Sequence, residues 1–294
     1  MKFKIIVDSS SGLTCSQAEE YGWTLLPLQA EINGKTYEIG KNLTIHDFAK
    51  IWNENPKKCD AKTAACIPAT IMNMVEECSK DYDKILIYTI SKELSSQNSM
   101  LKTMFADNDK VYIIDSTKLS YLIVKDLLLF EEAMKNGQSF EEACKIFAEE
   151  GPRLLLIPEF NDALVKGGRL TKPAAAIARL FKIVPIIQFG HGTLTKFGIG
   201  RVFRKTLVKQ LIDMKNVYPK PIDEDTYLIL PNAAQPKMQE IAKELKDSID
   251  FKDAYAIDLS PDISIHTGIG AVCFTITNIP KSIKEKFFKF TTKY

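Results

Sequence analysis

Two adjacent glycines followed by an arginine, Gly167-Gly168-Arg169, form the chemically most suggestive pattern in the sequence. Adjacent glycines can end a helix with a positive φ and let the backbone pass close to a neighbour. An arginine after such a turn is held in place, and a guanidinium fixed beside apolar sequence is suited to binding the anionic end of an apolar ligand. The same pattern also fits an ordinary helix C-cap followed by a surface arginine.

A histidine beside glycines is the second candidate. His266 is followed by Thr267 and Gly268, in what we expect to be a loop leading into a strand over 271–277. Glycine in such a loop permits a close approach by a ligand. A loop histidine that only bonds to the backbone is an equally open interpretation. We expect the other two histidines, His46 in a surface helix and His191 in a turn, to be structural.

Hydroxyl side chains gather where the predicted strands of the first half end. Ligands of open parallel sheets bind outside the carboxyl ends of the strands, so these hydroxyls predict a neutral crevice that hydrogen-bonds a carboxylate or phosphate oxygen. Taken one by one, most of them would also serve as helix caps. They are Ser9 to Ser11, Thr89, Ser91, Ser95, Ser96, Ser116 and Thr117.

The motifs of nucleotide and metal chemistry are absent from the sequence. It contains no Walker A loop, no GxGxxG and no HExxH motif, and its six cysteines include no CxxC pair. We therefore expect no cofactor, no metal and no nucleotide site. A free-standing serine hydrolase using Ser95 or Ser96 with His266 is a further alternative, although the sequence has no GxSxG elbow.

Composition fits a soluble globular protein that works in the cytoplasm. The chain has 294 residues, of which 45% are hydrophobic and 26% are charged, and its net charge of +2 gives no general attraction to nucleic acid. No run approaches the roughly 18 apolar residues of a membrane span. The first residues lead directly into a strand without a secretory segment, so we expect a cytoplasmic protein with at most transient membrane contact.

Alternating strands and helices predict an α/β fold with two domains. Apolar strands at 3–7, 84–90 and 111–114 alternate with helices, which favours a parallel sheet in a domain over 1–151. Asn33-Gly34 predicts an inserted hairpin near 25–40. After Gly151-Pro152 the pattern changes. The remaining strands include the pair 183–189 and 193–197, whose short loop requires antiparallel pairing, and a helix is expected over 173–180. We therefore expect a second domain over 152–294 with a mixed sheet.

Taken in order, these segments resemble the DegV family. Two departures remove hydroxyl and amide groups from the rim: the TSQPS element is reduced to Thr63 and Pro68, and Ser95-Ser96-Gln97-Asn98 stands where LSGTYQ is usual. The matching elements are 6–13 (DSxxDL), 26–37 (PL…G…Y), 90–96 (ISSxLSG), 112–116 (the central strand), 164–170 (LxxGGR) and 266–270 (HxGxG).

The resemblance implies a fatty acid in a tunnel between the two domains. Characterised members bind fatty acids and serve as the B subunit of bacterial fatty acid kinase, in which a separate dihydroxyacetone-kinase-like subunit phosphorylates the bound acid for phospholipid synthesis. The chain would then be a lipid-binding subunit and not itself an enzyme. The implied site residues are Thr63, Ser95, Ser96, Arg169 and His266 at the carboxylate, with Gly167, Gly168 and Gly268 allowing close approach.

The resemblance also implies a docking face for the kinase. We expect it at the basic cluster Arg201, Arg204 and Lys205, near the GGR segment. The lysine-rich run 281–293 carries apolar residues at helical spacing, which favours core packing with snorkelling lysines. A lipid transport or sensing protein that acts without any kinase is the alternative from another class.

Overall fold

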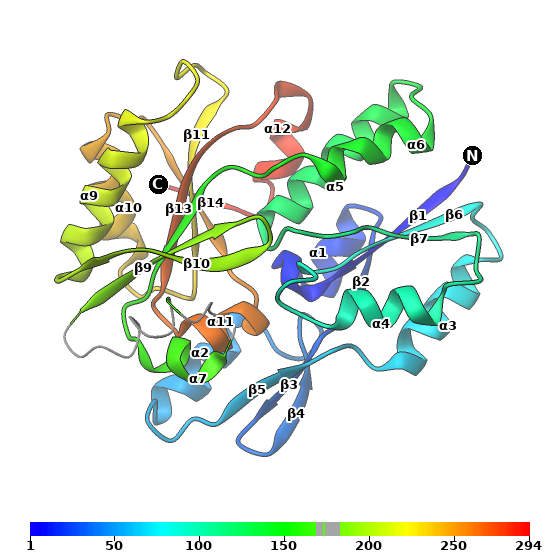
Figure 1. Cartoon of the computed structure of the whole chain (residues 1–294), viewed down its shortest axis with the longest axis horizontal. Coiled ribbons are helices and arrows are strands. Elements are labelled where there is room, and N and C mark those ends of the chain that lie inside the picture. The colour runs from blue at the N-terminus through cyan, green and yellow to red at the C-terminus, as the bar shows by residue number, and fades with distance from the viewer. Residues whose placement is uncertain (169–172, 174–182) are drawn as a thin grey trace.

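The computed structural model describes residues 1–168, 173 and 183–294 and shows the expected α/β fold (Figure 1). In that figure the N-terminal sheet lies on the right, the C-terminal sheet on the left, and helix α11 (Pro261–Thr267) between them. Arg169 and the body of the helix expected over 173–180 lie outside the described residues.

The N-terminal sheet is fully parallel, as the sequence predicted, with the order β2-β1-β6-β7. Its strands are continuous apolar runs because both faces are covered. In β1, Ile5 and Val7 pack toward α5 (Tyr121–Lys135), whereas Ile6 packs against α3 (Pro68–Cys78) and α4 (Gln97–Met104). The strands are β1 (Phe3–Asp8), β2 (Thr24–Leu26), β6 (Lys84–Tyr88) and β7 (Val111–Ile113). The remaining helices of this half are η1 (Ser9–Ser11), α1 (Cys15–Glu20), α6 (Phe140–Ala143) and η2 (Cys144–Ala148).

The hairpin at Asn33-Gly34 forms, but it belongs to a separate small sheet. Strands β3 (Gln29–Ile32) and β4 (Lys35–Glu38) flank the turn, and β5 (Ala61–Ala64) adds a third antiparallel strand. The segment before the turn divides between two sheets at Pro27, which has no N–H to donate to a ladder, so residues 24–26 belong to β2 and only 29–32 to the hairpin. Helix α2 (Ile45–Glu54) covers this unit and begins with a capping box of Thr44 and Asp47.

The C-terminal sheet is mixed, as expected. Its order is β10-β9-β8-β13-β11-β12-β14, and only β11 and β12 are parallel neighbours. Helices α9 (Phe203–Asn216) and α10 (Met238–Ser248) cover one face. The strands are β8 (Leu154–Ile157), β9 (Val184–Gly190), β10 (Thr193–Gly200), β11 (Thr226–Asn232), β12 (Ala254–Asp258), β13 (Val272–Asn278) and β14 (Thr292–Lys293). Two shorter helices are α7 (Asp162–Gly167) and α12 (Lys281–Phe288).

One apolar core joins the two large sheets. It contains residues of β1 and β6 from the first half, of β8, β11 and β13 from the second, and the buried side of α5. Ile283 and Phe287 of α12 belong to it, which confirms core packing for the start of the lysine-rich tail. The domain boundary proposed between 151 and 152 stays a prediction.

A buried ion pair fixes the start of α5 in this core. Lys118 Nζ lies 2.5 Å from Asp126 Oδ2, and the same carboxylate oxygen accepts a hydrogen bond from the Tyr88 hydroxyl at 2.8 Å. The exposed fractions of the Lys118 and Asp126 side chains are 4% and 8%. Since a buried charge is costly without its partner, each half of the pair depends on the other.

We predict that Lys118→Met lowers the free energy of unfolding by roughly 3–5 kcal/mol, because it leaves the Asp126 carboxylate buried and uncompensated. Urea unfolding of the single variant and of Lys118→Met/Asp126→Asn measures the effect. The double variant should recover much of the loss, since the amide is neutral and its oxygen still accepts from Tyr88. A single-variant loss below about 1 kcal/mol would show that the pair is not a stabilising contact.

Candidate ligand-binding site

An apolar pocket lies between the two halves of the chain. Leu154 and Leu156 of β8 and Phe189 of β9 form part of its wall from the C-terminal sheet, and Ile90 and Leu119 line it from the N-terminal half. All five are buried. The further apolar lining residues are Leu28, Ala64, Ala65, Leu94, Leu194, Leu259, Ile263 and Cys273. A lining of this kind suits a hydrocarbon chain.

Four of the predicted carboxylate-binding residues line this one pocket. The Thr63 hydroxyl on β5 and Nε2 of His266 on α11 are hydrogen-bonded at 2.8 Å, although 203 positions separate them in sequence. Ser95 and Ser96, between β6 and α4, are the other two. The fold therefore brings the predicted hydroxyls and the imidazole to the same pocket. Their role as carboxylate ligands stays a prediction, and Arg169 lies outside the described residues.

His266 is in a helix, and the expected loop was wrong. Ser260 precedes the helix and Pro261 occupies its first turn, where a missing N–H has no consequence. Gly268 ends α11 with a φ of 87°, and a Cβ there would lie 3.3 Å from that of Ala163. Gly268 thus permits the close packing of α11 against α7. Gly167 is the last residue of α7, and Gly168 caps that helix with a φ of 67°.

Asp262 is a pocket residue that the sequence analysis missed. It lies one turn before His266 on α11 and lines the same pocket, with only 5% of its surface exposed. The Ser260 hydroxyl donates to its Oδ1. Burial raises the pKa of the Asp262 carboxyl to about 6, against the opposing effect of Ser260. The Ser-Pro-Asp sequence is a normal helix start, so nothing in the sequence distinguished this carboxyl from a solvated one.

Most of the other strand-end hydroxyls are structural, so the expected rim of hydroxyls is smaller than predicted. Ser9 Oγ accepts from the Leu28 N–H at 3.1 Å, and Ser91 Oγ donates to the Gly192 carbonyl at 2.8 Å. Among the predicted hydroxyls, Ser95 and Ser96 are the ones that line the pocket in the described part of the chain.

A buried aspartate at the end of β1 organises the backbone beneath the pocket. Asp8 Oδ2 accepts from the Ile90 N–H at 2.8 Å and from the Gln97 side chain at 3.0 Å. Gln97 in turn accepts from the Cys66 N–H at 2.8 Å. Burial raises the pKa of Asp8 to about 7, although the hydrogen bond from Ser10 opposes this shift. The nearby Asp262 carboxyl raises the pKa of Asp8 as well. Gln97, a departure from the family pattern, therefore connects β1 to the segment that follows Thr63.

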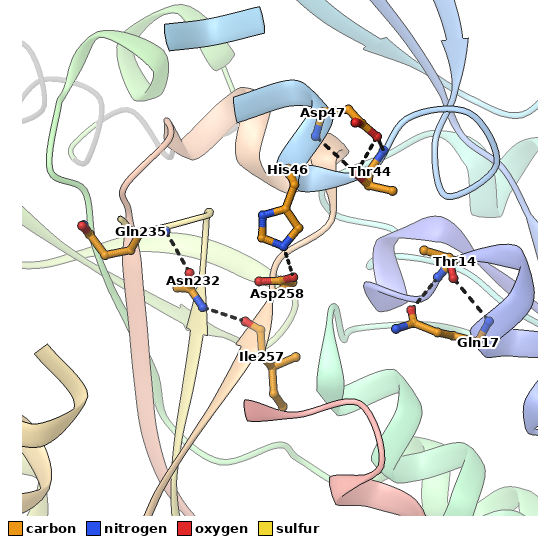
Figure 2. A network of polar contacts seen from close by, with 9 residues as sticks. All are labelled: Thr14, Gln17, Thr44, His46, Asp47, Asn232, Gln235, Ile257 and Asp258. Atoms are coloured by element: carbon orange, nitrogen blue, oxygen red, sulfur yellow. Dashed lines mark hydrogen bonds and ion pairs between the residues drawn. The ribbon is translucent and has the colours of Figure 1, made fainter. Parts of the chain in front are cut away.

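The two remaining histidines lie outside this pocket. Figure 2 shows His46 of α2 with its Nε2 2.9 Å from Asp258 Oδ2 at the end of β12, a contact between the small sheet's helix and the C-terminal sheet. The Thr14 and Thr44 hydroxyls in the same view cap their own helices. His191, in the β9–β10 turn, lies 3.2 Å from Glu150. Both contacts agree with structural roles.

The predicted docking residues lie at the end of β10 and the start of α9. Arg201 and Lys205 are exposed. Arg204 contacts two glutamates of α10, with its guanidinium 3.0 Å from Glu240 and 2.6 Å from Glu244. Its charge is therefore partly neutralised within the chain, whereas Arg201 and Lys205 form no ion pair with any other described residue.

Within the described residues, no helix combines the length and apolar character needed to cross a bilayer. The same residues include no group of three or more histidine, cysteine, aspartate or glutamate side chains placed to hold a metal ion.

The fold is that of an α/β protein with two large sheets, a small third sheet and a largely apolar pocket between its two halves, and comparison with known proteins identifies its family. The family model described as "Uncharacterised protein, DegV family" matches residues 2–278. A DegV domain-containing protein of Mycoplasmopsis pulmonis is 37% identical over 288 residues, covering 97% of this chain and 98% of the relative. The chain belongs to the DegV family.

Solved structures of the family share the fold. A fatty-acid-binding DegV family protein from Thermus thermophilus matches with a TM-score of 0.79 at 18% identity, covering 95% of this chain and 100% of the other. A stearic acid-binding protein from Eubacterium ventriosum matches with a TM-score of 0.80 at 20% identity, covering 94% and 98%. These structural neighbours bind fatty acids.

The raised pKa of Asp262 predicts a pH-dependent stability. The folded-state pKa of about 6 exceeds the ordinary 3.8. The contribution of Asp262 to the free energy of unfolding is therefore present at low pH and is lost as the pH rises from about 4 through about 6. Asp262→Asn removes this titration. Urea unfolding should therefore show that the free energy of unfolding of the variant rises relative to that of the wild type across that range, by at most about 1.4 kcal/mol per pH unit. A difference that stays constant with pH would show that Asp262 titrates normally.

Proposed function

We propose that this protein binds a long-chain fatty acid in the pocket between its sheets and presents the carboxylate to a separate ATP-dependent kinase subunit. The observation that carries the proposal is the hydrogen-bonded pair of Thr63 and His266 in a pocket whose other walls are largely apolar. Structural neighbours named for bound fatty acids support the ligand class.

The chemistry of the lining fits both parts of such a ligand. A carboxylate out of water requires hydrogen-bond donors, and the Thr63, Ser95 and Ser96 hydroxyls with the His266 ring supply them. Arg169 is proposed as a charged partner of the same head group. Each buried CH₂ of the acyl chain contributes about 0.8 kcal/mol, so most of the affinity would come from the apolar wall.

The kinase role explains a binding protein that lacks nucleotide motifs. A carboxylate oxygen would attack the γ-phosphorus of ATP, the bond to the ADP oxygen would break, ADP would leave, and an acyl phosphate would form. Since the sequence has no Walker A loop, the partner would hold the ATP. The partner would dock on the basic face formed by Arg201, Arg204 and Lys205, with Arg204 held in place by its glutamates.

A lipid carrier without a kinase would use the same pocket, and phosphoryl transfer distinguishes the two functions. The hydrolase alternative is less well supported, because Nε2 of His266 is hydrogen-bonded to the Thr63 hydroxyl and not to either serine.

We predict that Thr63→Val weakens binding of stearate to the delipidated protein roughly ten- to a hundredfold. The substitution keeps the shape and removes one hydrogen bond to a charged group, which contributes about 1.5–3 kcal/mol. Calorimetric titration measures the change. Thr36→Val, on the exposed part of β4 in the same small sheet, is the matched control and should bind normally. Wild-type affinity in a folded Thr63→Val protein would remove Thr63 from the head-group site.

We also predict that Arg201→Glu/Lys205→Glu slows association with the kinase subunit and abolishes its salt dependence, while stearate affinity is unchanged. Arg204 is left intact because its reversal would place three negative side chains together. Surface plasmon resonance at several salt concentrations measures the rates. The control is Lys289→Glu in the tail. Unchanged association in the first variant, with a loss in the control, would place docking on the tail.

A further inference from the structure

The pocket has polar groups that a simple fatty acid does not use. In α11, Asp262, Ile263, His266 and Thr267 line the pocket together, because residues at this spacing share one face of a helix. His266 contacts Thr63, which places it at the proposed head group. Asp262 lies one turn away, about 6 Å along the helix axis.

The carboxyl of Asp262 has one oxygen without a hydrogen bond to the described residues, although the backbone N–H groups of Asp262 and Ile263 lie near enough to lower its pKa. Its Oδ1 receives the Ser260 hydroxyl, whereas its Oδ2 is buried without a hydrogen bond in the described part of the chain. The Thr267 hydroxyl, on the same pocket-facing side, is likewise buried and unpartnered among the described residues. A buried acceptor without a donor costs about 1–3 kcal/mol, so a ligand that supplies one would be favoured.

We propose that Asp262 is a second polar contact of the pocket, which accepts a hydrogen bond from a hydroxyl group on the bound acyl chain. The ligand class would then be a monohydroxylated long-chain fatty acid. This inference rests on the proposed function, because it assumes that an acyl chain occupies the pocket.

The charge of the site excludes the ligand's own carboxylate as the partner. A second anion beside Asp262 would be repelled, and Asp8 lies near enough to add to that repulsion. A neutral hydroxyl donates the missing hydrogen bond without adding charge. The Thr267 hydroxyl, which can donate or accept, is placed on the same face to complete the contact.

The test compares stearate with a positional series of monohydroxystearates, using delipidated protein and calorimetric titration. In the wild type, at least one isomer should bind about tenfold or more tightly than stearate. Asp262→Leu should abolish that preference. Ser264→Ala is the matched control, because its buried hydroxyl is on the same helix but does not line the pocket. This variant should keep the preference.

A second variant keeps the test decisive if Asp262→Leu does not fold. Asp262→Asn retains an oxygen but loses the charge, so its preference for the hydroxylated ligand should fall severalfold. No preference in the wild type, or a preference that persists in both variants, would overturn the inference while stearate binding still supports the proposed function. Failure of the wild type to bind any of these lipids would instead overturn the proposed function itself.

Discussion

The packing of α5 against both large sheets is the interaction on which the rest of the structure depends. Neighbouring residues of this helix reach opposite halves of the molecule: Asp126 accepts the Tyr88 hydroxyl of β6, and Lys125 donates to the Asn278 carbonyl of β13 at 2.9 Å. The apolar face of the helix contributes to the core that both sheets share. Because close-packed cores resist deformation, the two sheets hold a defined separation, and the pocket is lined by residues of both halves.

The polar side chains near the pocket make two kinds of contact. Asp8 accepts a hydrogen bond from the Ile90 N–H and Gln97 accepts one from the Cys66 N–H, and these bonds fix segments that border the pocket. Thr63 and His266 instead join β5 to α11 at the pocket wall. Both members of the second pair line the pocket, so this pair is the one relevant to a ligand.

Where its side chains are described, the pocket has the Asp262 carboxyl in its lining, and a second carboxyl, that of Asp8, lies nearby. Two buried carboxyls, Asp8 and Asp262, have raised pKa values because burial disfavours their charged forms. An anionic ligand would therefore be oriented with its carboxylate toward His266 and its chain away from it. The same electrostatics makes a hydroxyl on the chain, and not a second charge, the fitting partner for Asp262.

The sequence by itself determined the family, the parallel and mixed sheets and the hairpin at Asn33-Gly34, because these are encoded by local periodicity, turn chemistry and ordered motifs. The family resemblance also indicated Thr63, Ser95, Ser96 and His266, whose role as ligands of a carboxylate stays a prediction. Only the tertiary structure decided which polar groups line the pocket. Strand β5 has no apolar pattern in its sequence. The pKa of Asp262 depends on burial by segments that are distant in sequence. The bond between Thr63 and His266 joins positions that no local rule relates, since pairing at long range is set by the packing of whole elements.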